Sequence, residues 1–274
     1  MLDLDGDVCP DGIRALENLI ASGFCASAEY CQTIPSTNTQ ALLAIRESKL
    51  DDSILPRCYL ADEQTAGRGR HGRSWVSDEG TLTFSLVVSR SIDDLKQIQF
   101  LPLAVGLGIA RLIEFEFAPV QAKLKWPNDV NVGGGKVAGV LLETTAESPD
   151  MTVIGVGINV SSDPSLEENQ LGITTRSLTQ IAGRRISRYE ILEPLVESII
   201  TAIDESLVSP ANFVQEFRER CLLTGREITF RHRDAEKSGL CQGIADDGTL
   251  LVKTSEGTQV VSSGETRLVR FVKP

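Results

Sequence analysis

The chain has 274 residues, of which 41% are hydrophobic and 24% are charged, and its formal net charge at pH 7 is −11. This length allows one large domain, or a large domain with a small one. A general nucleic-acid-binding surface needs clustered lysine and arginine side chains, which an acidic chain of this kind does not favour. We therefore expect no nucleic-acid partner, although a local basic loop could still bind a small anion.

Cysteine and histidine usage argues against a metal site. The six cysteines form no C-x-x-C pair, and only two histidines are present, so we predict no metal-ligating residues and reduced thiols. The N-terminus is acidic and has no signal-peptide pattern, and the longest apolar stretch, residues 100–110, is too short to span a bilayer. We expect a cytoplasmic protein with no membrane partner.

The first elements in chain order are two helices. Apolar residues recur at helical spacing within 12–23, and this single helix is too little for a helix-turn-helix unit, so we expect no DNA-binding N-terminal domain. Thr37 and Gln40 have the spacing of a capping box, followed by an apolar face, and predict a second helix from this point.

The middle of the chain reads as strands around one buried helix. Residues 57–64 and 80–89 predict strands, and in the second of these the apolar residues alternate. Residues 101–116 predict a buried helix. Three consecutive glycines at 133–135 predict a tight hairpin between two of the strands that follow. These further strand candidates are residues 122–126, 130–132, 136–144 and 151–160.

Two helices, followed by a region of short strands, are expected towards the C-terminus. Ser187 and Glu190 fit a capping box for a helix over 187–207, in which Pro194 is expected to cause a kink. A second helix is expected over 209–223, with Ser209 as N-cap and Pro210 in the first turn. Turn signals then separate short strand candidates, a pattern typical of a small β-barrel. These candidates are residues 226–231, 237–245, 249–254, 258–263 and 266–272.

These patterns predict three parts of the chain. Residues 1–28 form a short helical extension, residues 29–222 form a catalytic or binding domain, and residues 223–274 form the small barrel domain.

Positive charge is concentrated in residues 65–75, "TAGRGRHGRSW", which we call the arginine loop. Its glycines allow close approach of backbone N–H groups to a ligand, its arginines can hydrogen-bond carboxylate or phosphate oxygens, and Trp75 offers a flat face for stacking. Taken alone, the arginine loop is equally compatible with a mobile surface loop or an RNA-binding tract, and His71 with a surface residue.

Three further segments carry soft signals of their own. "KWPND" at 125–129 could be an ordinary turn, Lys136 at the start of a strand could be an exposed lysine, and "GVGIN" at 155–159 could contain a β-bulge. The last segment also has a G-x-G pattern, but it lacks the third glycine and the helix of a dinucleotide-binding fingerprint.

In chain order, however, these segments resemble one family closely. S-T-N at 36–38, Gln64, G-R-G-R-H-G-R-S-W, K-W-P-N-D, K-V-A-G-V-L-L-E and G-V-G-I-N resemble the biotin protein ligase family over roughly residues 30 to 270. His71 stands where many members carry another arginine, and the N-terminal DNA-binding domain of the bifunctional members is missing. The second difference argues against transcriptional repression.

The resemblance implies an α+β fold and an activity. The expected catalytic domain is like that of class II aminoacyl-tRNA synthetases, with a mixed, mainly antiparallel sheet flanked by helices, and the C-terminal barrel is expected to be SH3-like. Family members use ATP, with Mg²⁺, to convert biotin to biotinyl-5′-AMP. They then transfer biotin to a lysine of a biotin carboxyl carrier protein or domain. Members include monomers and dimers, so a homodimer is compatible with the resemblance.

The resemblance also assigns roles to residues. Those expected at the reacting atoms are Lys136, Arg70 and Asp129, with Asp129 orienting the acceptor lysine or removing its proton. Those expected to bind biotin are Ser36, Thr37, Asn38, Gln64, Gly67, Arg68, Gly69, Arg70, Lys136, Gly139 and Gly157. Those expected to bind ATP or the adenylate are Arg68, Arg70, Arg73, Trp75, Asn128, Lys136 and Asn159.

Other functions stay open at this stage. A lipoate or octanoate ligase or transferase shares a related fold, but the arginine loop together with K-W-P-N-D favours biotin. A biotin-responsive DNA-binding repressor is opposed by the acidic charge, and a binding-only biotin sensor by the full set of charged residues. Because biotinyl-AMP reacts with water, we also expect the arginine loop to be mobile without ligand and to close over the adenylate.

Overall fold

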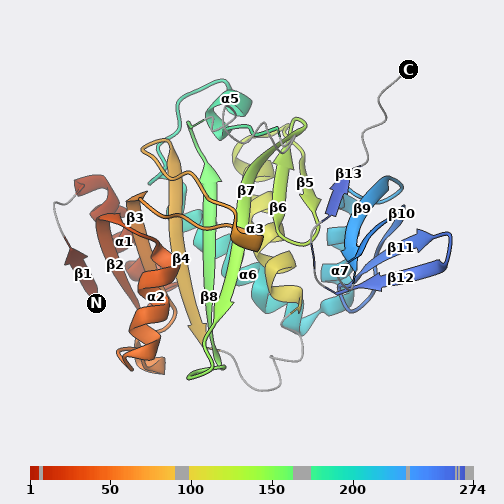
Figure 1. Ribbon diagram of the computed structural model, residues 1–274. Helices are drawn as coiled ribbons and strands as arrows, with labels where there is room; N and C mark the ends of the chain where they lie inside the picture. The colour runs from red at the N-terminus through yellow and green to blue at the C-terminus, as the bar shows by residue number, and fades with distance from the viewer. Residues whose placement is uncertain are drawn as a thin grey trace.

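The computed structural model describes residues 1–5, 9–89, 99–162, 174–232, 235–262, 264 and 266–268 (Figure 1). Parts of the predicted last two strands, residue 263 and residues 269–272, lie outside these ranges. The described residues form a large sheet covered by helices and a small sheet at the C-terminus. None of the described helices is both long and apolar enough to cross a membrane.

The large sheet is mixed and mainly antiparallel, as predicted. Its strand order is β1-β2-β3-β4-β8-β7-β6-β5, and only the β1–β2 and β2–β3 pairs are parallel. The strands are β1 (Leu2–Asp5), β2 (Ser27–Ile34), β3 (Arg57–Gln64), β4 (Thr81–Ser89), β5 (Ala122–Lys125), β6 (Asp129–Val132), β7 (Gly135–Thr144) and β8 (Met151–Asn159).

Helices cover the two faces of the large sheet unequally. One face packs against α1 (Pro10–Ala21), α3 (Leu101–Glu116), α6 (Leu192–Val208) and α7 (Pro210–Arg220), and the main hydrophobic core lies between them. The other face packs against α2 (Thr37–Arg46) in a smaller core. Along β4, Leu82, Phe84 and Leu86 point into the main core, which confirms the predicted alternation. Their neighbours Thr83 and Ser85 therefore face the α2 side.

Two strands and the start of α2 differ from the sequence predictions. Strands β1 and β2 were not predicted, because β2 mixes apolar with polar residues. Arg57 ion-pairs with Glu29 of β2 and thereby satisfies it inside the structure. The Thr37–Gln40 capping box is wrong, since Ser36 is the N-cap residue and makes no side-chain cap bond. The Gln40 amide instead donates to Glu29 at 2.8 Å.

The predicted helix over 187–207 begins later than expected. Helix α6 starts at Leu192 with Ile191 as N-cap, so the Ser187–Glu190 capping box is wrong. Pro194 consequently falls in the first turn, where backbone N–H groups have no partner within the helix and proline is tolerated. A short helix, α5 (Leu178–Ala182), was not predicted and has a capping box of its own. The glycine hairpin between β6 and β7 is confirmed, with Gly133 and Gly134 at positive φ.

The small sheet is antiparallel, with the order β12-β11-β10-β9-β13, and lies beyond the β5 edge of the large sheet (Figure 1). Its strands are β9 (Glu227–His232), β10 (Ala235–Ile244), β11 (Leu250–Thr254), β12 (Gly257–Val261) and β13 (Thr266–Leu268). Short one-turn helices η1 (Asp52–Ile54) and η2 (Arg70–Gly72) complete the described elements. The domain boundaries near residues 28 and 222 stay predictions.

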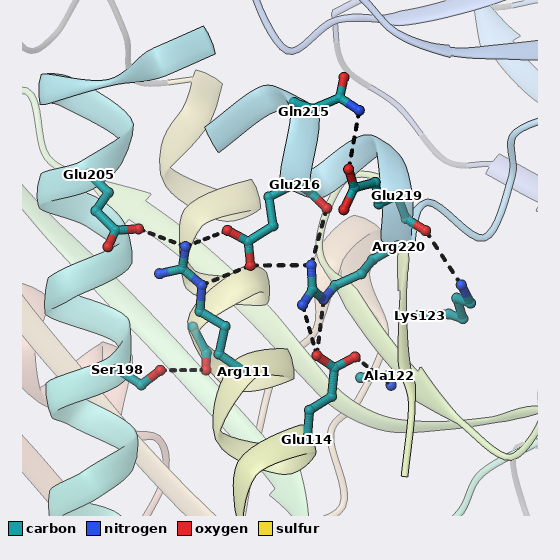
Figure 2. Close-up of polar contacts among 11 residues, drawn as sticks. Arg111, Glu114, Ala122, Lys123, Ser198, Glu205, Gln215, Glu216, Glu219 and Arg220 are labelled. Atoms are coloured by element: carbon teal, nitrogen blue, oxygen red, sulfur yellow. Dashed lines mark hydrogen bonds and ion pairs between the residues drawn. The ribbon is translucent and has the colours of Figure 1, made fainter. Parts of the chain in front are cut away.

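Helix α7 joins the two sheets and is held by ion pairs (Figure 2). Arg111 of α3 bonds Glu216 of α7 and also pairs with Glu205 of α6. Arg220 of α7 forms a second link between these helices, because its guanidinium donates to Glu114 of α3 at 2.8 Å. The three helices therefore share one network of alternating charges on their common surface.

Candidate active site

A cavity of about 540 Å³ lies on the α2 side of the large sheet. Its floor contains Gly155 and Gly157 of β8, which pair with Ser85 and Thr83 of β4, and Gly139 of β7, which pairs with Gly157. The absence of side chains from these glycines leaves room above the sheet. All the predicted site residues line the cavity except two, Gly67 and Asn159.

One end of the cavity is built from hydroxyl and amide groups. The Gln64 Oε1 atom accepts hydrogen bonds from the Thr37 backbone N–H at 2.7 Å and from the Thr37 hydroxyl at 3.1 Å. The Ser85 hydroxyl donates to Asn38 Oδ1 at 2.6 Å and lies 2.7 Å from Thr37 Oγ1. Ser36 is buried beside them at the helix start. Ser85 was missed from the sequence, because nothing in the β4 pattern marked it apart from its place in the alternation.

A carboxylate of the K-V-A-G-V-L-L-E motif, to which the sequence assigned no role, joins this end to the arginine loop. Glu143, at the end of β7, accepts hydrogen bonds from Asn38 Nδ2 at 2.8 Å and from Arg68 Nη2 at 2.8 and 3.1 Å. Asn38 has almost no exposed surface, and Gly155 has to lack a side chain because a Cβ there would lie 2.3 Å from Asn38 Oδ1. In this state the Arg68 guanidinium is therefore paired with a carboxylate of the protein.

The centre of the cavity carries a cation–carboxylate cluster. Lys136 Nζ lies 2.9 Å from Asp129 Oδ1, and Lys125 Nζ lies 3.8 Å from Asp129 Oδ2. Burial acts to raise the pKa of Asp129, but the attraction of Lys136 and Lys125 outweighs it, so this pKa lies below its usual range. Asp129 is thus ionised at neutral pH and fixes the Lys136 ammonium in the cavity.

The turn before β6 orients a second cation. Arg70 Nη1 donates to Asn128 Oδ1 at 3.2 Å, and Asn128 Nδ2 donates to the Val140 carbonyl at 2.8 Å. Val140 N–H in turn donates to the Asn128 carbonyl at 3.1 Å. Asn128 is therefore locked onto β7, and Arg70 is drawn towards the same part of the cavity as Lys136.

The arginine loop is folded back on itself and seats Trp75 on the glycine floor. The backbone N–H of Trp75 donates to the Gly67 carbonyl at 2.9 Å, and the backbone N–H of Gly69 donates to the Arg73 carbonyl at 2.7 Å. A Cβ at Gly157 would lie 2.3 Å from the Trp75 ring, and Lys136 Nζ lies 5.6 Å from the ring centre. The loop's expected mobility and closure over a ligand stay predictions.

The two predicted residues outside the cavity lining have supporting positions. A Cβ at Gly67 would lie 2.4 Å from the Trp75 carbonyl oxygen, so glycine permits the loop to close on itself. Asn159 Nδ2 donates to the carbonyls of Lys136 and Arg176, at 3.4 and 3.3 Å. Asn159 thus faces the backbone at the start of β7 instead of lining the cavity.

No cluster of three or more potential metal ligands among His, Cys, Asp and Glu occurs in the part of the chain that the structure describes. Asp129, which lines the cavity, and Glu143, which bonds two of the lining residues, are both paired with cationic side chains. These residues do not form a ready-made site for a divalent cation.

The fold and the cavity define a class, which comparison with protein families identifies. Residues 30–159 match the model of the Biotin/lipoate A/B protein ligase family, and residues 223–266 match that of the Biotin protein ligase C terminal domain. The chain belongs to the biotin protein ligase family, as the sequence predicted.

Individual relatives agree in sequence and in structure. The chain is 31% identical to the biotin–[acetyl-CoA-carboxylase] ligase of Paracoccus denitrificans over 238 residues, which are 84% of this chain and 95% of that protein. It is also 31% identical to the bifunctional ligase/repressor BirA of Bacillus subtilis over 212 residues. This match covers 76% of the chain but only 65% of that relative's length.

A biotin protein ligase from Aquifex aeolicus, solved in complex with biotin and ATP, superimposes with a TM-score of 0.74 at 28% identity. The match covers 89% of this chain and 98% of that one. The expected fold is thereby confirmed.

Proposed function

We propose that this protein uses ATP to convert biotin to biotinyl-5′-AMP and then transfers biotin to one lysine of the carrier domain of a biotin-dependent carboxylase. The observation that carries the proposal is one cavity in which a neutral amide–hydroxyl end adjoins a cation cluster. Biotin has the matching pair of features, a neutral ureido ring at one end and a carboxylate at the other. The Paracoccus relative, whose name gives this activity, and the Aquifex enzyme with bound biotin and ATP support the proposal.

The ureido ring would lie at the amide–hydroxyl end, against Ser36, Thr37 and Gln64. A ureido group offers both N–H donors and a carbonyl acceptor, and hydroxyl and amide groups can serve both. The glycine floor would form a wall free of side chains beside the biotin rings, and the Trp75 ring, which lies against Gly157, would offer the adenine base a flat face for stacking.

In the first step the biotin carboxylate attacks the α-phosphorus of ATP, the bond to the β-phosphate oxygen breaks, and pyrophosphate leaves. Two anions must meet, so the step needs fixed positive charge in a partly dry site. Lys136, held by Asp129, and Arg70, held by Asn128, are the side chains proposed to supply it.

In the second step the acceptor lysine, after losing one proton to solvent, attacks the acyl carbon as a neutral amine; the bond between that carbon and the phosphate oxygen breaks, and AMP leaves with this oxygen. Asp129 is ionised, so it can accept a hydrogen bond from the amine, orient it towards the anhydride and take up the second proton as the amide forms. Arg73 and Asn128 are proposed to bind the nucleotide in this reaction.

Magnesium would enter as part of the nucleotide substrate, bound to the phosphate oxygens, because the described residues provide no cage for it. A cytoplasmic location, the absence of a nucleic-acid partner and the oligomeric state, monomer or homodimer, stay predictions.

The test is isotope exchange between pyrophosphate and ATP, measured with biotin, lipoate or octanoate as the acid. We expect exchange with biotin alone. Exchange that depends on lipoate or octanoate instead would assign the protein to the other activity of its wider family, and no exchange with any acid would refute adenylation.

A further inference from the structure

The small sheet forms two hydrogen bonds to one residue of the K-W-P-N-D segment, Trp126. The Trp126 indole N–H donates to the Gly248 carbonyl at 3.0 Å, in the turn between β10 and β11. The Thr266 hydroxyl of β13 donates to the Trp126 carbonyl at 3.1 Å. Both side chains are almost fully buried, with 3% exposure for Trp126 and 2% for Thr266, so water does not compete for these bonds.

The small sheet is itself anchored to the helix layer. Arg218 of α7 donates to the Ile244 carbonyl at 2.9 Å and to Asp246 at 2.8 Å. On its other side α7 is tied to α3 by the Arg111–Glu216 and Arg220–Glu114 bonds (Figure 2). The hydrophobic core is also continuous between the two sheets. The two hydrogen bonds to Trp126 therefore come from a sheet that is itself held in place by α7 and the core.

Trp126 is followed directly by the turn that orients the two cationic side chains of the cavity. Asn128 and Asp129 follow it within three residues, and they orient Arg70 and Lys136 at 3.2 and 2.9 Å. A shift of this turn would move both cations together relative to the amide–hydroxyl end, which is built on α2, β3 and β4. Misplacement by about 1 Å can cost as much as about a hundredfold in rate.

We infer that the small C-terminal sheet is a positioning element of the catalytic centre, acting through Thr266 and the Trp126 indole on Asn128 and Asp129. The inference rests on the proposed adenylation and deepens it: the small sheet controls the rate of the chemical step and leaves biotin binding unchanged. Thr266 and Trp126 also border the cavity, and Thr266 has the role of a positioning residue because its hydroxyl donates to the Trp126 carbonyl.

The test compares three variants of the full chain. Thr266→Val keeps the shape of the side chain but removes the donor, Thr266→Ser restores the donor, and Thr258→Val removes a threonine hydroxyl from the same sheet, where it bonds only Gln242 in the described residues. In biotin-dependent exchange we expect Thr266→Val to lower kcat by about ten- to a hundredfold. The KM for biotin should stay within twofold, Thr266→Ser should recover most of the rate, and Thr258→Val should match the unmutated protein.

A second readout does not depend on activity. Amide hydrogen exchange over residues 128–132 should accelerate in Thr266→Val and not in Thr258→Val, with exchange in β4 and β8 unchanged. An unchanged kcat in Thr266→Val, or unchanged amide hydrogen exchange in the turn, would overturn the inference. So would an effect confined to the KM for ATP, which would make Thr266 a nucleotide contact, or an equal loss in Thr266→Ser. If the unmutated protein itself shows no biotin-dependent exchange between pyrophosphate and ATP, the proposed function fails. The amide hydrogen exchange measurement then still decides whether Thr266 holds the turn.

Discussion

Replacing Lys136 by glutamine removes the cation nearest the centre of the cavity while keeping a polar side chain of similar length. Lys136 Nζ lies 2.9 Å from Asp129, and both side chains are about one-fifth exposed or less, at 20% and 16%. Fixed charges aimed at developing negative charge contribute about 3 kcal/mol each in comparable sites. We therefore expect kcat for biotin-dependent exchange to fall roughly a hundredfold, since each 1.4 kcal/mol is about tenfold.

The same substitution should change the acid sensitivity of the fold. Asp129 has a folded-state pKa below its usual value, so it stabilises the fold above the unfolded pKa of about 3.9, and this stabilisation is lost as the pH falls through the folded pKa. Without Lys136, the burial of Asp129 is opposed only by the weaker attractions of Lys125 and Arg73, so the pKa of Asp129 should rise. The free energy of unfolding of Lys136→Gln should then fall by less on acidification below the unfolded pKa than that of the unmutated protein.

The matched control is Lys123→Gln, on the exposed side of β5, where the Lys123 ammonium contacts only the Glu219 carbonyl in the described residues (Figure 2). It should leave the exchange rate and the pH dependence of unfolding unchanged. If Lys136→Gln keeps kcat within threefold of the unmutated protein, Lys136 does not stabilise the transition state, and the proposed division of labour in the cavity is wrong.

Three other predictions address the floor, the loop and the thiols. Gly157→Ala places a methyl group 2.3 Å from the Trp75 ring; this overpacking costs about 1–3 kcal/mol, so calorimetry should show biotin binding weakened by about five- to 150-fold, and unchanged affinity would contradict the contact. Glu143→Gln removes the charge partner of Arg68, so trypsin should cleave the arginine loop faster in the absence of ligand; an unchanged cleavage rate would show that this pair does not hold the loop. Burial raises the pKa of the Cys25 thiol from 9.0 to about 12, so its contribution to stability is present below pH 9 and is lost as the pH rises towards 12; a mass-spectrometric alkylation assay at pH 8 should find it unmodified in the folded protein, and rapid labelling would contradict its burial.

The sequence predicted most of the architecture because its strong signals are local. Alternation along 80–89, the glycines at 133–135 and the proline at the start of 101–116 each determine a local conformation without help from the rest of the chain. Strand β2 was missed because its polar residues are satisfied by distant partners, as Glu29 is by Arg57. The predicted start of the helix over 187–207 was wrong because Arg188 serves elsewhere, donating to the carbonyls of Asp62 and Thr81.

The site shows the same division between local pattern and tertiary contact. The motif residues were recognisable by type and order, and the structure brings nearly all of them to one cavity. Glu143 stood at the end of a recognised motif but received no role, because the partners that reveal it, Asn38 and Arg68, are distant in the sequence. Ser85 was not recognisable, since a serine within a strand carries no local signal of function. Asn159 shows the converse: its motif was visible, but its amide turns to the backbone of Lys136.

Transfer of biotin to a carrier domain is the most direct test of the proposed activity. Intact-mass and peptide mass spectrometry should be carried out on the biotin carrier domain of a carboxylase after incubation with this protein, ATP, Mg²⁺ and biotin. We expect one biotinyl group on a single lysine, dependent on ATP. An unmodified carrier domain, or one modified equally without ATP, would contradict the proposed function.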